Sequence, residues 1–480
     1  MDINEAKQRR ENVESKTVVM RLDGKMDDLA SAVGDQEQNL KLREFLKRES
    51  GVFTQETKKP AHIEIMQQQE LVGYEPASDT GHFRFYPKGA LMKDLLSDLA
   101  EDVAIRQIGA TKIETPLIYR NEGAVKEQAA SFHESDYHMR EDGKELILRF
   151  AGDFGLFNMI KDVRAGEKQL PLRVYEISPS FRREKRGSCA GLKRLRGFTM
   201  PDIHCFCGDL EQGMNEFARL HRFYDQFLKD SGLEFALGFR TTKDFLAENN
   251  GFILDRLKES KQDALVEVLD SMKHYWVLKN EFQYIDTSKD NIQLSTVQLD
   301  ISDAARYGLN YTASDGSKKP FTIVHSSMGS IERIMGAILE ERAREMTSGV
   351  KPTFPYWLSP TQLRLIPVNE KHLPYVESIA AGLSGVARVD IDDRGESIGK
   401  RVRAAEKEWV PYYAVIGDNE LESGKYILKA RGKNSGDIGS EPIGVAVLND
   451  FLHKAQGSRP FRRSYLDQHV SRQLRFGSGY

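Results

Sequence analysis

The chain has 480 residues, of which 40% are hydrophobic and 29% charged, a composition that excludes wholesale disorder and allows about three domains. The 69 Lys and Arg and the 72 Asp and Glu leave a net charge of −3, which excludes a uniformly basic coat for nucleic acid but not a local basic surface. No apolar run approaches the roughly 18 residues of a membrane span, and the polar N-terminus has no signal-peptide core. Three cysteines fit a reducing compartment, so we expect a cytoplasmic protein without a membrane partner.

The first part of the chain changes in character near residue 60. Residues 1–60 are polar and rich in Lys and Glu, which predicts a polar N-terminal segment that is either a short helix or partly mobile. Farther on, apolar residues recur at every fourth position from Leu91 to Val103, which predicts a helix, and a strand is expected over 111–115.

Strands dominate the pattern between residues 145 and 335, interrupted by helical stretches at 210–231 and 243–275. Because these strands do not alternate regularly with helices, they predict an antiparallel sheet flanked by helices, an α+β fold. From 363 to 416 strands and helices alternate cleanly, which predicts a small α/β domain with a parallel sheet. The tail over 451–480 is basic, and it is either a solvated segment or one that contacts phosphates.

Two strand-like pieces that flank a basic loop form a candidate nucleotide site. The first ends in Phe181-Arg182-Arg183-Glu184 and the second begins at Arg196-Gly197-Phe198. An arginine can clamp a phosphate through two hydrogen bonds, a glutamate can accept from an amino group, and a phenylalanine can stack on a purine. The alternative is a hairpin with a solvated basic loop.

A second element is Gly329-Ser330-Ile331-Glu332-Arg333, at the start of an amphipathic pattern. The glycine permits close approach of the backbone to a ligand, and the arginine in the first turn can reach a second phosphate. Taken alone, this pattern occurs at many helix starts.

Together these residues resemble the three signature motifs of class II aminoacyl-tRNA synthetases. The first motif would be the helix from Leu91 with its strand before Pro116, which builds the dimer interface in that class, so the resemblance implies a homodimer. The second would run from Arg182 to Phe198, and the third from Gly329 to Arg333.

Further motifs resemble the threonyl-tRNA synthetase family of archaeal type over about residues 60–455. These are Leu170-Pro171-Leu172-Arg173, Arg196-Gly197-Phe198-Thr199, Asp202-Ile203-His204 and Thr296-Val297-Gln298-Leu299-Asp300. The resemblance implies a class II catalytic domain over 61–358 and an α/β anticodon-binding domain with a basic tail over 359–480. It also implies the activity: threonine is activated with ATP and then transferred to tRNA(Thr).

The family holds a zinc ion through one cysteine and two histidines, and the ion binds the amino and hydroxyl groups of threonine. The resemblance places the histidines at His204 and His325, and it places Asp153 at the cysteine position. Aspartate is a legitimate zinc ligand, although it is harder than a thiolate and can alter the choice of metal. The alternative is that Asp153 is an ordinary polar residue and that no zinc binds.

The resemblance also implies the nucleotide contacts. Arg182 and Arg333 would clamp the ATP phosphates together with Mg²⁺, Glu184 would accept from the adenine amino group, and Phe198 would stack on adenine. The remaining implied contacts are Arg194 to the nucleotide or the tRNA end, Gln293 to the nucleotide, and Asp202 and Gln298 to threonine. Met200 stands where a glutamine is common in the family.

In the C-terminal domain the resemblance places Glu420 at a base-reading glutamate and Lys429 at the position of a base-reading arginine. Lysine lacks the two-pronged donor of arginine, so its contact with a base is less specific.

Two other functions stay open from the sequence. One is a class II synthetase for proline or serine, against which His204 and the segment 296–300 speak. The other is a non-catalytic paralogue that binds tRNA, against which Arg182, Glu184 and Arg333 speak.

Full-length members of the family usually place an editing domain ahead of the catalytic core. Because the core resemblance begins near residue 60, we expect no editing of seryl-tRNA in cis and a separate trans-editing protein as a partner.

Overall fold

The computed structural model describes residues 13–33, 39–51, 59–130, 136–185, 187–431 and 441–476. The chain divides into two compact units, which are described separately. The core unit comprises Met1–Pro60, Thr80–His82 and Ala100–Ala337, and the C-terminal unit comprises Ala61–Asp79, Phe83–Leu99 and Ile338–Tyr480.

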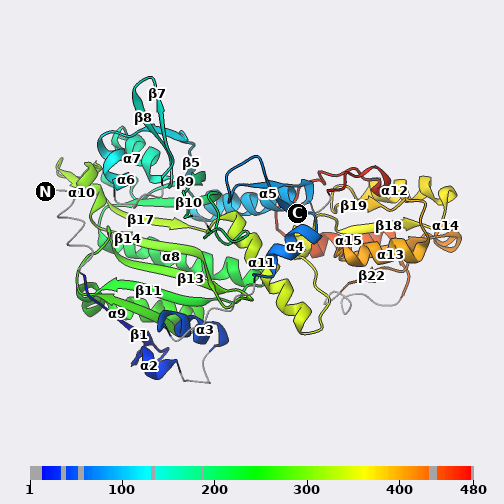
Figure 1. Ribbon diagram of the computed structural model, residues 1–480, viewed down its shortest axis with the longest axis horizontal. Helices are drawn as coiled ribbons and strands as arrows, with labels where there is room; N and C mark the ends of the chain where they lie inside the picture. The colour runs from blue at the N-terminus through cyan, green and yellow to red at the C-terminus, as the bar shows by residue number, and fades with distance from the viewer. Residues whose placement is uncertain are drawn as a thin grey trace. The chain divides into compact units, whose positions relative to one another are not determined.

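A large sheet of ten strands, counted over the described residues, is the centre of the core unit (Figure 1). Its strands, in spatial order, are β2 (Met26–Asp28), β1 (Ser15–Met20), β12 (Ala264–Leu269), β11 (Ala236–Thr242), β13 (Trp276–Ile285), β14 (Asn291–Asp300), β17 (Thr322–Ser327), β10 (Gly197–Cys207), β9 (Leu172–Phe181) and β5 (Thr111–Lys112). All pairs are antiparallel except β11 with β12 and β5 with β9. The predicted antiparallel sheet flanked by helices is therefore confirmed.

Helices cover both faces of this sheet. Gly238 on β11 faces Phe45 of α3 (Leu40–Glu49), because a Cβ built on Gly238 would lie 3.5 Å from that ring. The next residue, Phe239, faces His221 of α8 (Leu210–Asp230), with ring centroids 6.2 Å apart. Successive side chains of a strand point to opposite faces, so α3 and α8 lie on opposite sides.

The smaller elements of the core unit are α2 (Leu29–Ala32), β6 (Ile118–Arg120), α6 (Gly123–Ala130), β7 (His138–Glu141), β8 (Lys144–Leu148), α7 (Asp153–Lys161), α9 (Lys243–Ser260), α10 (Asp303–Tyr307), β15 (Asn310–Thr312) and β16 (Lys318–Pro320). The helix predicted over 243–275 is wrong beyond Ser260. Lys261 adopts a left-handed conformation that ends α9, and the apolar run that follows forms β12 instead.

The N-terminal segment is not only helical. The prediction missed β1 and β2, which extend the large sheet at the free edge of β12, with Val19 paired to Leu265. Val18, Val19 and Met20 are buried there. Three consecutive buried apolar residues do not alternate with polar ones, so the usual sign of a half-buried strand is missing from the sequence.

The C-terminal unit confirms the predicted alternation of strands and helices. A four-stranded sheet has the order β19-β18-β20-β22, and its first three strands are parallel. The elements of this unit are α4 (His62–Gln68), β3 (Val72–Tyr74), β4 (Phe83–Phe85), β18 (Leu363–Pro367), α12 (Leu373–Leu383), β19 (Val389–Ile391), α13 (Ile398–Lys407), β20 (Tyr412–Ile416), α14 (Asp418–Ser423), β21 (Lys425–Tyr426), β22 (Lys429–Ala430), β23 (Ile443–Gly444) and α15 (Val445–Gln456). Helices α5 (Pro87–Asp102) and α11 (Ile331–Thr347) run through both units.

The apolar stripe of α5 is buried within the chain's own fold. Leu91, Leu95 and Leu99 are 1%, 0% and 5% exposed, so the stripe is not a free surface for a second subunit. This removes the apolar stripe as evidence for the predicted dimer interface, since a dimer contact needs exposed side chains.

Two arginines of the basic tail are paired with carboxylates rather than solvated. Arg462 forms ion pairs with Asp94 and Asp98 of α5, at 2.9 and 2.5 Å. Arg475 pairs with Glu70 and Glu408, at 3.4 and 3.0 Å. Carboxylates of the same unit therefore neutralise part of the tail's charge.

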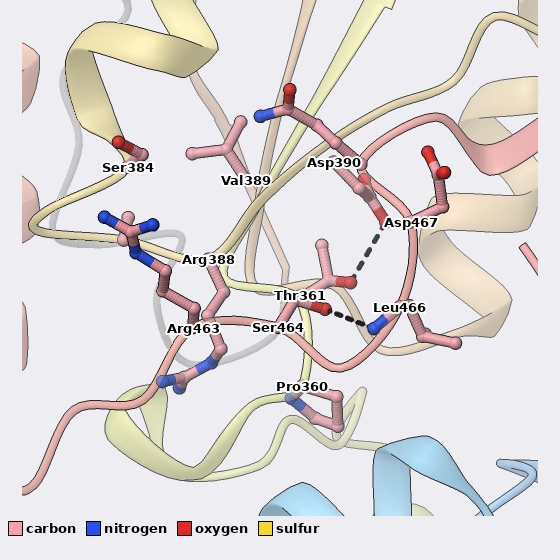
Figure 2. Close-up of a pocket in the computed structure, with 12 residues that line it drawn as sticks. Pro360, Thr361, Ser384, Arg388, Val389, Asp390, Arg463, Ser464, Leu466 and Asp467 are labelled. Atoms are coloured by element: carbon pink, nitrogen blue, oxygen red, sulfur yellow. Dashed lines mark hydrogen bonds between the residues drawn. The ribbon is translucent and has the colours of Figure 1, made fainter.

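A small pocket of about 190 Å³ lies between this tail and the amino ends of β18 and β19 (Figure 2). Several of its polar groups are engaged within the protein: Thr361 Oγ1 donates to Asp390 at 3.0 Å, and the Leu466 amide donates to Ser464 Oγ at 3.1 Å. The guanidinium of Arg388 donates to backbone carbonyls, among them that of Ser359. The pocket is therefore a gap in the tail's packing, and we assign no ligand to it.

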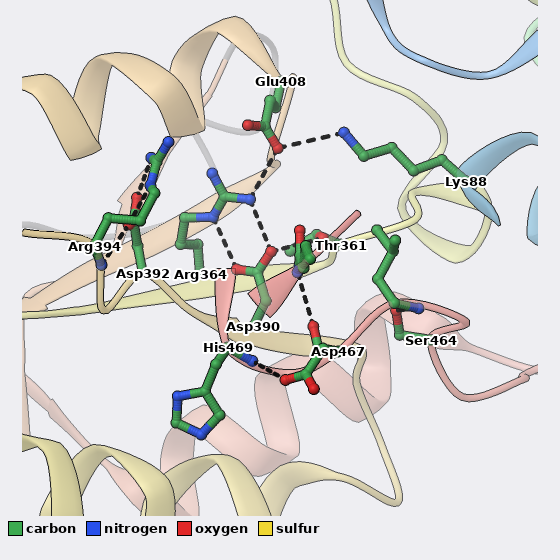
Figure 3. Close-up of polar contacts among 12 residues, drawn as sticks. Lys88, Thr361, Arg364, Asp390, Asp392, Arg394, Glu408, Ser464, Asp467 and His469 are labelled. Atoms are coloured by element: carbon green, nitrogen blue, oxygen red, sulfur yellow. Dashed lines mark hydrogen bonds and ion pairs between the residues drawn. The ribbon is translucent and has the colours of Figure 1, made fainter. Parts of the chain in front are cut away.

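A buried ionic cluster fixes the first strand of this sheet (Figure 3). Arg364 is fully buried and donates twice to Asp390, at 2.8 and 2.8 Å, and once to Glu408 at 3.0 Å. Burial raises the pKa of Glu408, but the charges of Arg364, Lys88 and Arg475 outweigh burial and hold that pKa well below its usual range. The carboxylate therefore stays ionised at neutral pH.

Candidate active site

One face of β10 carries three of the predicted site residues, Phe198, Asp202 and His204. Phe198, Met200, Asp202 and His204 are spaced by two, so they share a face of the strand. The next residue, Cys205, points the other way, with its Sγ 3.6 Å from the Glu216 carboxylate of α8. The candidate site therefore lies on the sheet face opposite to α8.

A bulge in β14 brings two glutamines to this site. Gln293 pairs with Gln283, whereas Thr296 pairs with Glu281, so β14 holds one residue more than β13 between these two pairs. This extra residue shifts the alternation of side chains, and both Gln293 and Gln298 line the same cavity although they are five positions apart.

Asp153, His204 and His325 form a compact cluster of potential metal ligands. Their ligand atoms all lie within 4.8 Å of one another. His204 and His325 are register partners on β10 and β17, and Asp153 is the first residue of α7. His204 Nε2 is 2.9 Å from Asp153 Oδ1, and His325 Nδ1 is 3.9 Å from the same oxygen.

The chemistry of this cluster suits a divalent metal. His325 Nδ1 is buried without a hydrogen-bond partner, while its Nε2 lies 2.9 Å from Asp300 Oδ2. A histidine that donates from one ring nitrogen to a carboxylate leaves the other nitrogen for a metal. Burial raises the pKa of Asp153, but the hydrogen bond with His204 and the charge of His325 lower it to about 2.

Asp202 lies beside this cluster in a buried position. Burial, and then the charge of Asp153, raise the pKa of the Asp202 carboxyl well above its usual range. A Cβ built on Gly152 would lie 3.3 Å from Asp202 Oδ2. The side chain therefore has little free space on the Gly152 side.

A cavity of about 490 Å³ extends along β14 beside the cluster. Its wall carries six basic side chains and two acidic ones, Glu184 and Asp290. The basic ones are Arg48, Arg182, Lys193, Arg194, Lys279 and Arg333. Such an excess of positive charge in a concave site suits a polyphosphate ligand.

The predicted nucleotide residues meet in this cavity. The guanidinium of Arg182 lies 5.3 Å from the ring centroid of Phe198. Glu184 accepts a hydrogen bond from Arg194 Nε at 2.9 Å. The acidic side chain, the arginines and the aromatic ring thus come together from β10 and from the loop that joins β9 to β10.

Arg333 reaches the same cavity from the start of α11. Gly329 has φ of +95°, and a Cβ on it would lie 2.8 Å from the Leu294 carbonyl carbon, so the tight approach to β14 requires glycine. The amide of Arg333 donates to Ser330 Oγ at 3.1 Å, and its guanidinium donates to the carbonyls of Lys193 and Gln293. Burial, and then the neighbouring Arg182, lower its pKa to about 10.

Tyr275, Lys193 and Arg48 are among the cavity residues that the sequence analysis missed. Tyr275 donates its hydroxyl to Gln298 at 2.7 Å, and its ring centroid is 5.1 Å from that of His325. Lys193 and Arg48 complete the basic wall. Tyr275 and Arg48 lie in segments without a recognisable motif, but Lys193 stands directly before Arg194 in the basic loop and could have been included.

The two predicted base-reading residues lie in the C-terminal unit. Glu420 is in the first turn of α14, directly after β20, and accepts from the Gly417 amide at 2.9 Å. Lys429 is exposed on β22, opposite Tyr413 of β20. Both side chains therefore belong to the region around β20.

The sheet, the three motif regions and the arginine-rich cavity define the core of a class II aminoacyl-tRNA synthetase. The family description "tRNA synthetase class II core domain (G, H, P, S and T)" matches residues 135–342, and "Anticodon binding domain" matches residues 362–443.

Curated relatives give the particular family. The chain is 39% identical over 446 residues to the threonine–tRNA ligase of Methanosarcina barkeri, covering 91% of this chain and 69% of that protein. It is 38% identical over 470 residues to the threonine–tRNA ligase of Methanosphaera stadtmanae, covering 96% of this chain and 74% of that protein. The chain belongs to the threonine–tRNA ligase family, as its sequence motifs predicted.

Two solved structures share the fold. The RNA binding domain of threonyl-tRNA synthetase from Cryptosporidium parvum matches with a TM-score of 0.72 at 24% identity, over 84% of this chain and 99% of that chain. Giardia lamblia prolyl-tRNA synthetase in complex with prolyl-adenylate matches with a TM-score of 0.65 at 17% identity, over 84% of this chain and 81% of that chain. Among the described residues no helix is long and apolar enough to span a bilayer.

Proposed function

We propose that the protein activates threonine with ATP and transfers it to tRNA(Thr). The observation that carries this proposal is the juxtaposition of two sites on one sheet face. The Asp153–His204–His325 cluster lies beside Tyr275, which also lines the cavity that holds Arg182 and Arg333. An amino-acid site next to a polyphosphate site is what adenylate formation requires.

In the activation step, a carboxylate oxygen of threonine attacks the α-phosphorus of ATP and pyrophosphate leaves. The nucleophile is already ionised, so no general base is needed. Arg182 and Arg333, with Mg²⁺ on the phosphates, hold the reactants in line and stabilise the charge that builds up on the phosphate oxygens. Phe198 stacks on the adenine and Glu184 accepts from its amino group.

Asp153, His204 and His325 fit a bound Zn²⁺ because His325 Nδ1 is buried and has no hydrogen-bond partner, and because Asp153 is ionised. When bound, the ion would act as a Lewis acid that takes the amino and hydroxyl groups of threonine as ligands. Asp202 and Gln298 orient the same amino acid from β10 and β14. The carboxylate at position 153 makes a harder ligand set than a thiolate would.

Transfer to tRNA needs the 3′ ribose hydroxyl to attack the threonyl carbonyl, with AMP leaving. Glu420 and Lys429 contact the anticodon and so select tRNA(Thr). The protein works as a homodimer, a proposal that rests on family resemblance alone. Light scattering at micromolar concentration tests it, and a monomer mass contradicts it.

The test of the function is ATP–pyrophosphate exchange with each of the twenty amino acids in turn. Threonine should support the fastest exchange. Arg182→Ala should abolish it, whereas Arg183→Ala, which removes an exposed neighbour, should leave it near the wild-type rate. Faster exchange with proline, or with no amino acid at all, contradicts the proposal.

A further inference from the structure

Helix α3 of the N-terminal segment contributes one side chain to the wall of the nucleotide cavity. Arg48, in its last turn, lines this cavity, whereas every other lining residue comes from the span 182–333. Its side chain is 33% exposed and forms an ion pair with Asp290, the residue directly before β14. No motif covers this part of the chain.

The sheet holds α3 firmly against the end of β13. Leu42, Phe45 and Leu46 of the helix are buried in one apolar cluster with Ile285, the last residue of β13. Lys41 places its ammonium group 4.6 Å from the ring centroid of Tyr284, the preceding residue. The position of Arg48 is therefore set by packing against the same hairpin whose turn carries Asp290.

That turn is organised around a second aspartate. Asp286 is buried, and its Oδ1 accepts from the Ser288 amide, the Ser288 hydroxyl and the Asp290 amide at 2.9, 2.6 and 2.9 Å. Its Oδ2 accepts from Lys193 Nζ at 2.8 Å, and Lys193 also pairs with Asp290. Asp290 thus lies between two cations, Arg48 and Lys193.

Lys193 connects this turn with the catalytic arginine. Its backbone carbonyl accepts from Arg333 Nε at 3.1 Å. We propose that Arg48 is a positioning residue of the nucleotide site: it holds Asp290, Asp290 holds Lys193, and the carbonyl of Lys193 sets the guanidinium of Arg333. The N-terminal segment then takes part in ATP binding through a chain of contacts that reaches the ATP phosphates. This inference rests on the proposed function.

A purely structural role is the competing explanation. Lys47 and Arg48 both lie in the last turn of α3, where positive charge stabilises a helix. Lys47 is exposed and does not line the cavity. Lys47→Ala is therefore a matched control, because it removes the same charge from the same turn without touching Asp290.

The experiment measures threonine-dependent ATP–pyrophosphate exchange in the full chain, with KM determined separately for ATP and for threonine. Arg48→Ala should raise KM for ATP about tenfold, since loss of a positioning contact shifts Arg333 without removing it. KM for threonine should stay within twofold of the wild-type value, and Arg48→Lys should restore part of the ATP affinity. Lys47→Ala should match the wild type in every constant.

A double-mutant cycle tests the route through Asp290. In the Asp290→Asn background, Arg48→Ala should have little further effect on KM for ATP. Additive effects of the two changes, an equal rise in both KM values, or a Lys47→Ala enzyme as impaired as Arg48→Ala would each overturn the inference. Direct titration with a non-hydrolysable ATP analogue compares the nucleotide affinity of the same variants. This measurement tests the inference even if the wild-type chain shows no exchange with threonine.

Discussion

His204 and His325 stand directly opposite each other on neighbouring antiparallel strands, with ring centroids 5.1 Å apart and ring planes at 89°. The strand register sets this relationship, although 120 residues of chain separate the two histidines. A third ligand, Asp153, comes from the start of a helix. The paired strands fix the two histidines in register, so we expect a substitution of Asp153 to change the proposed ligand set rather than the fold.

Removal of the carboxylate should therefore remove the metal. Asp153→Ala should lower the affinity for zinc by more than about 100-fold, since even groups that only orient metal ligands contribute 10–100-fold. Asp153→Cys should keep the metal and favour zinc over harder cations. Metal content by mass spectrometry of the purified proteins is the measurement. Asp162→Ala, at the exposed end of the same helix, is the control, and a zinc-replete Asp153→Ala protein would contradict the assignment.

Loss of the partly buried Arg333 of α11 should act on catalysis without unfolding the protein. Arg333→Ala should reduce the exchange rate by about 10²–10³, the effect typical of a donor that stabilises transition-state charge. Arg333→Lys should recover little, because one ammonium group cannot replace the several donors of a guanidinium. Exchange kinetics and the melting temperature should be measured together. A rate within tenfold of the wild type in Arg333→Ala would be inconsistent with this role.

Discrimination between amino acids should depend strongly on the hydroxyl group and weakly on the methyl group. Valine should be rejected because it cannot supply the hydroxyl ligand, whereas serine, which lacks only a methyl group, should be activated about 10–200-fold less efficiently than threonine. The ratio of kcat/KM values in pyrophosphate exchange measures both. If threonine were preferred over serine by more than about 10,000-fold in the activation step, the prediction of weak discrimination on the methyl group would be wrong.

Substitutions of the two predicted base-reading residues should weaken the binding of tRNA and leave the binding of ATP unchanged. Glu420→Ala and Lys429→Ala should each raise KM for tRNA(Thr) about tenfold or more, the size of one lost base contact. Pyrophosphate exchange, which needs no tRNA, should be unchanged. Lys425→Ala is the control, because it removes an exposed lysine four positions before Lys429. An equal effect of all three changes would mean that only the overall charge matters.

Breaking the buried ion pair of the first parallel strand should cost much more stability than breaking an exposed pair. Asp390→Ala should destabilise the protein by about 3–5 kcal/mol, because it leaves the guanidinium of Arg364 buried with one partner fewer. Lys400→Ala breaks an exposed pair with Glu396 and should cost only about 0.3–0.5 kcal/mol. Urea unfolding, followed by tryptophan fluorescence, measures the free energy of unfolding of both variants. Equal losses in the two variants would contradict the argument that burial makes the Arg364–Asp390 pair more costly to break.

The sequence by itself was enough for the family, and it named several of the residues that line the cavity. Arg182, Glu184, Phe198 and Arg333 stand in short local motifs, so their types and spacing could be recognised without the fold. The C-terminal alternation of strands and helices was equally local, because each element there shows its own hydrophobic period.

Only the tertiary structure decided which distant residues meet. The register of β10 with β17 pairs the two histidines, and the bulge in β14 turns Gln293 and Gln298 into one cavity. The burial of the α5 stripe within the chain's own fold could not be predicted from the sequence either, because periodicity shows that a face is apolar but not which residues cover it. The place of Arg48 in the cavity wall also depends on a contact between distant parts of the chain. Its helix packs on the hairpin that carries Asp290, and that contact joins residues 242 positions apart.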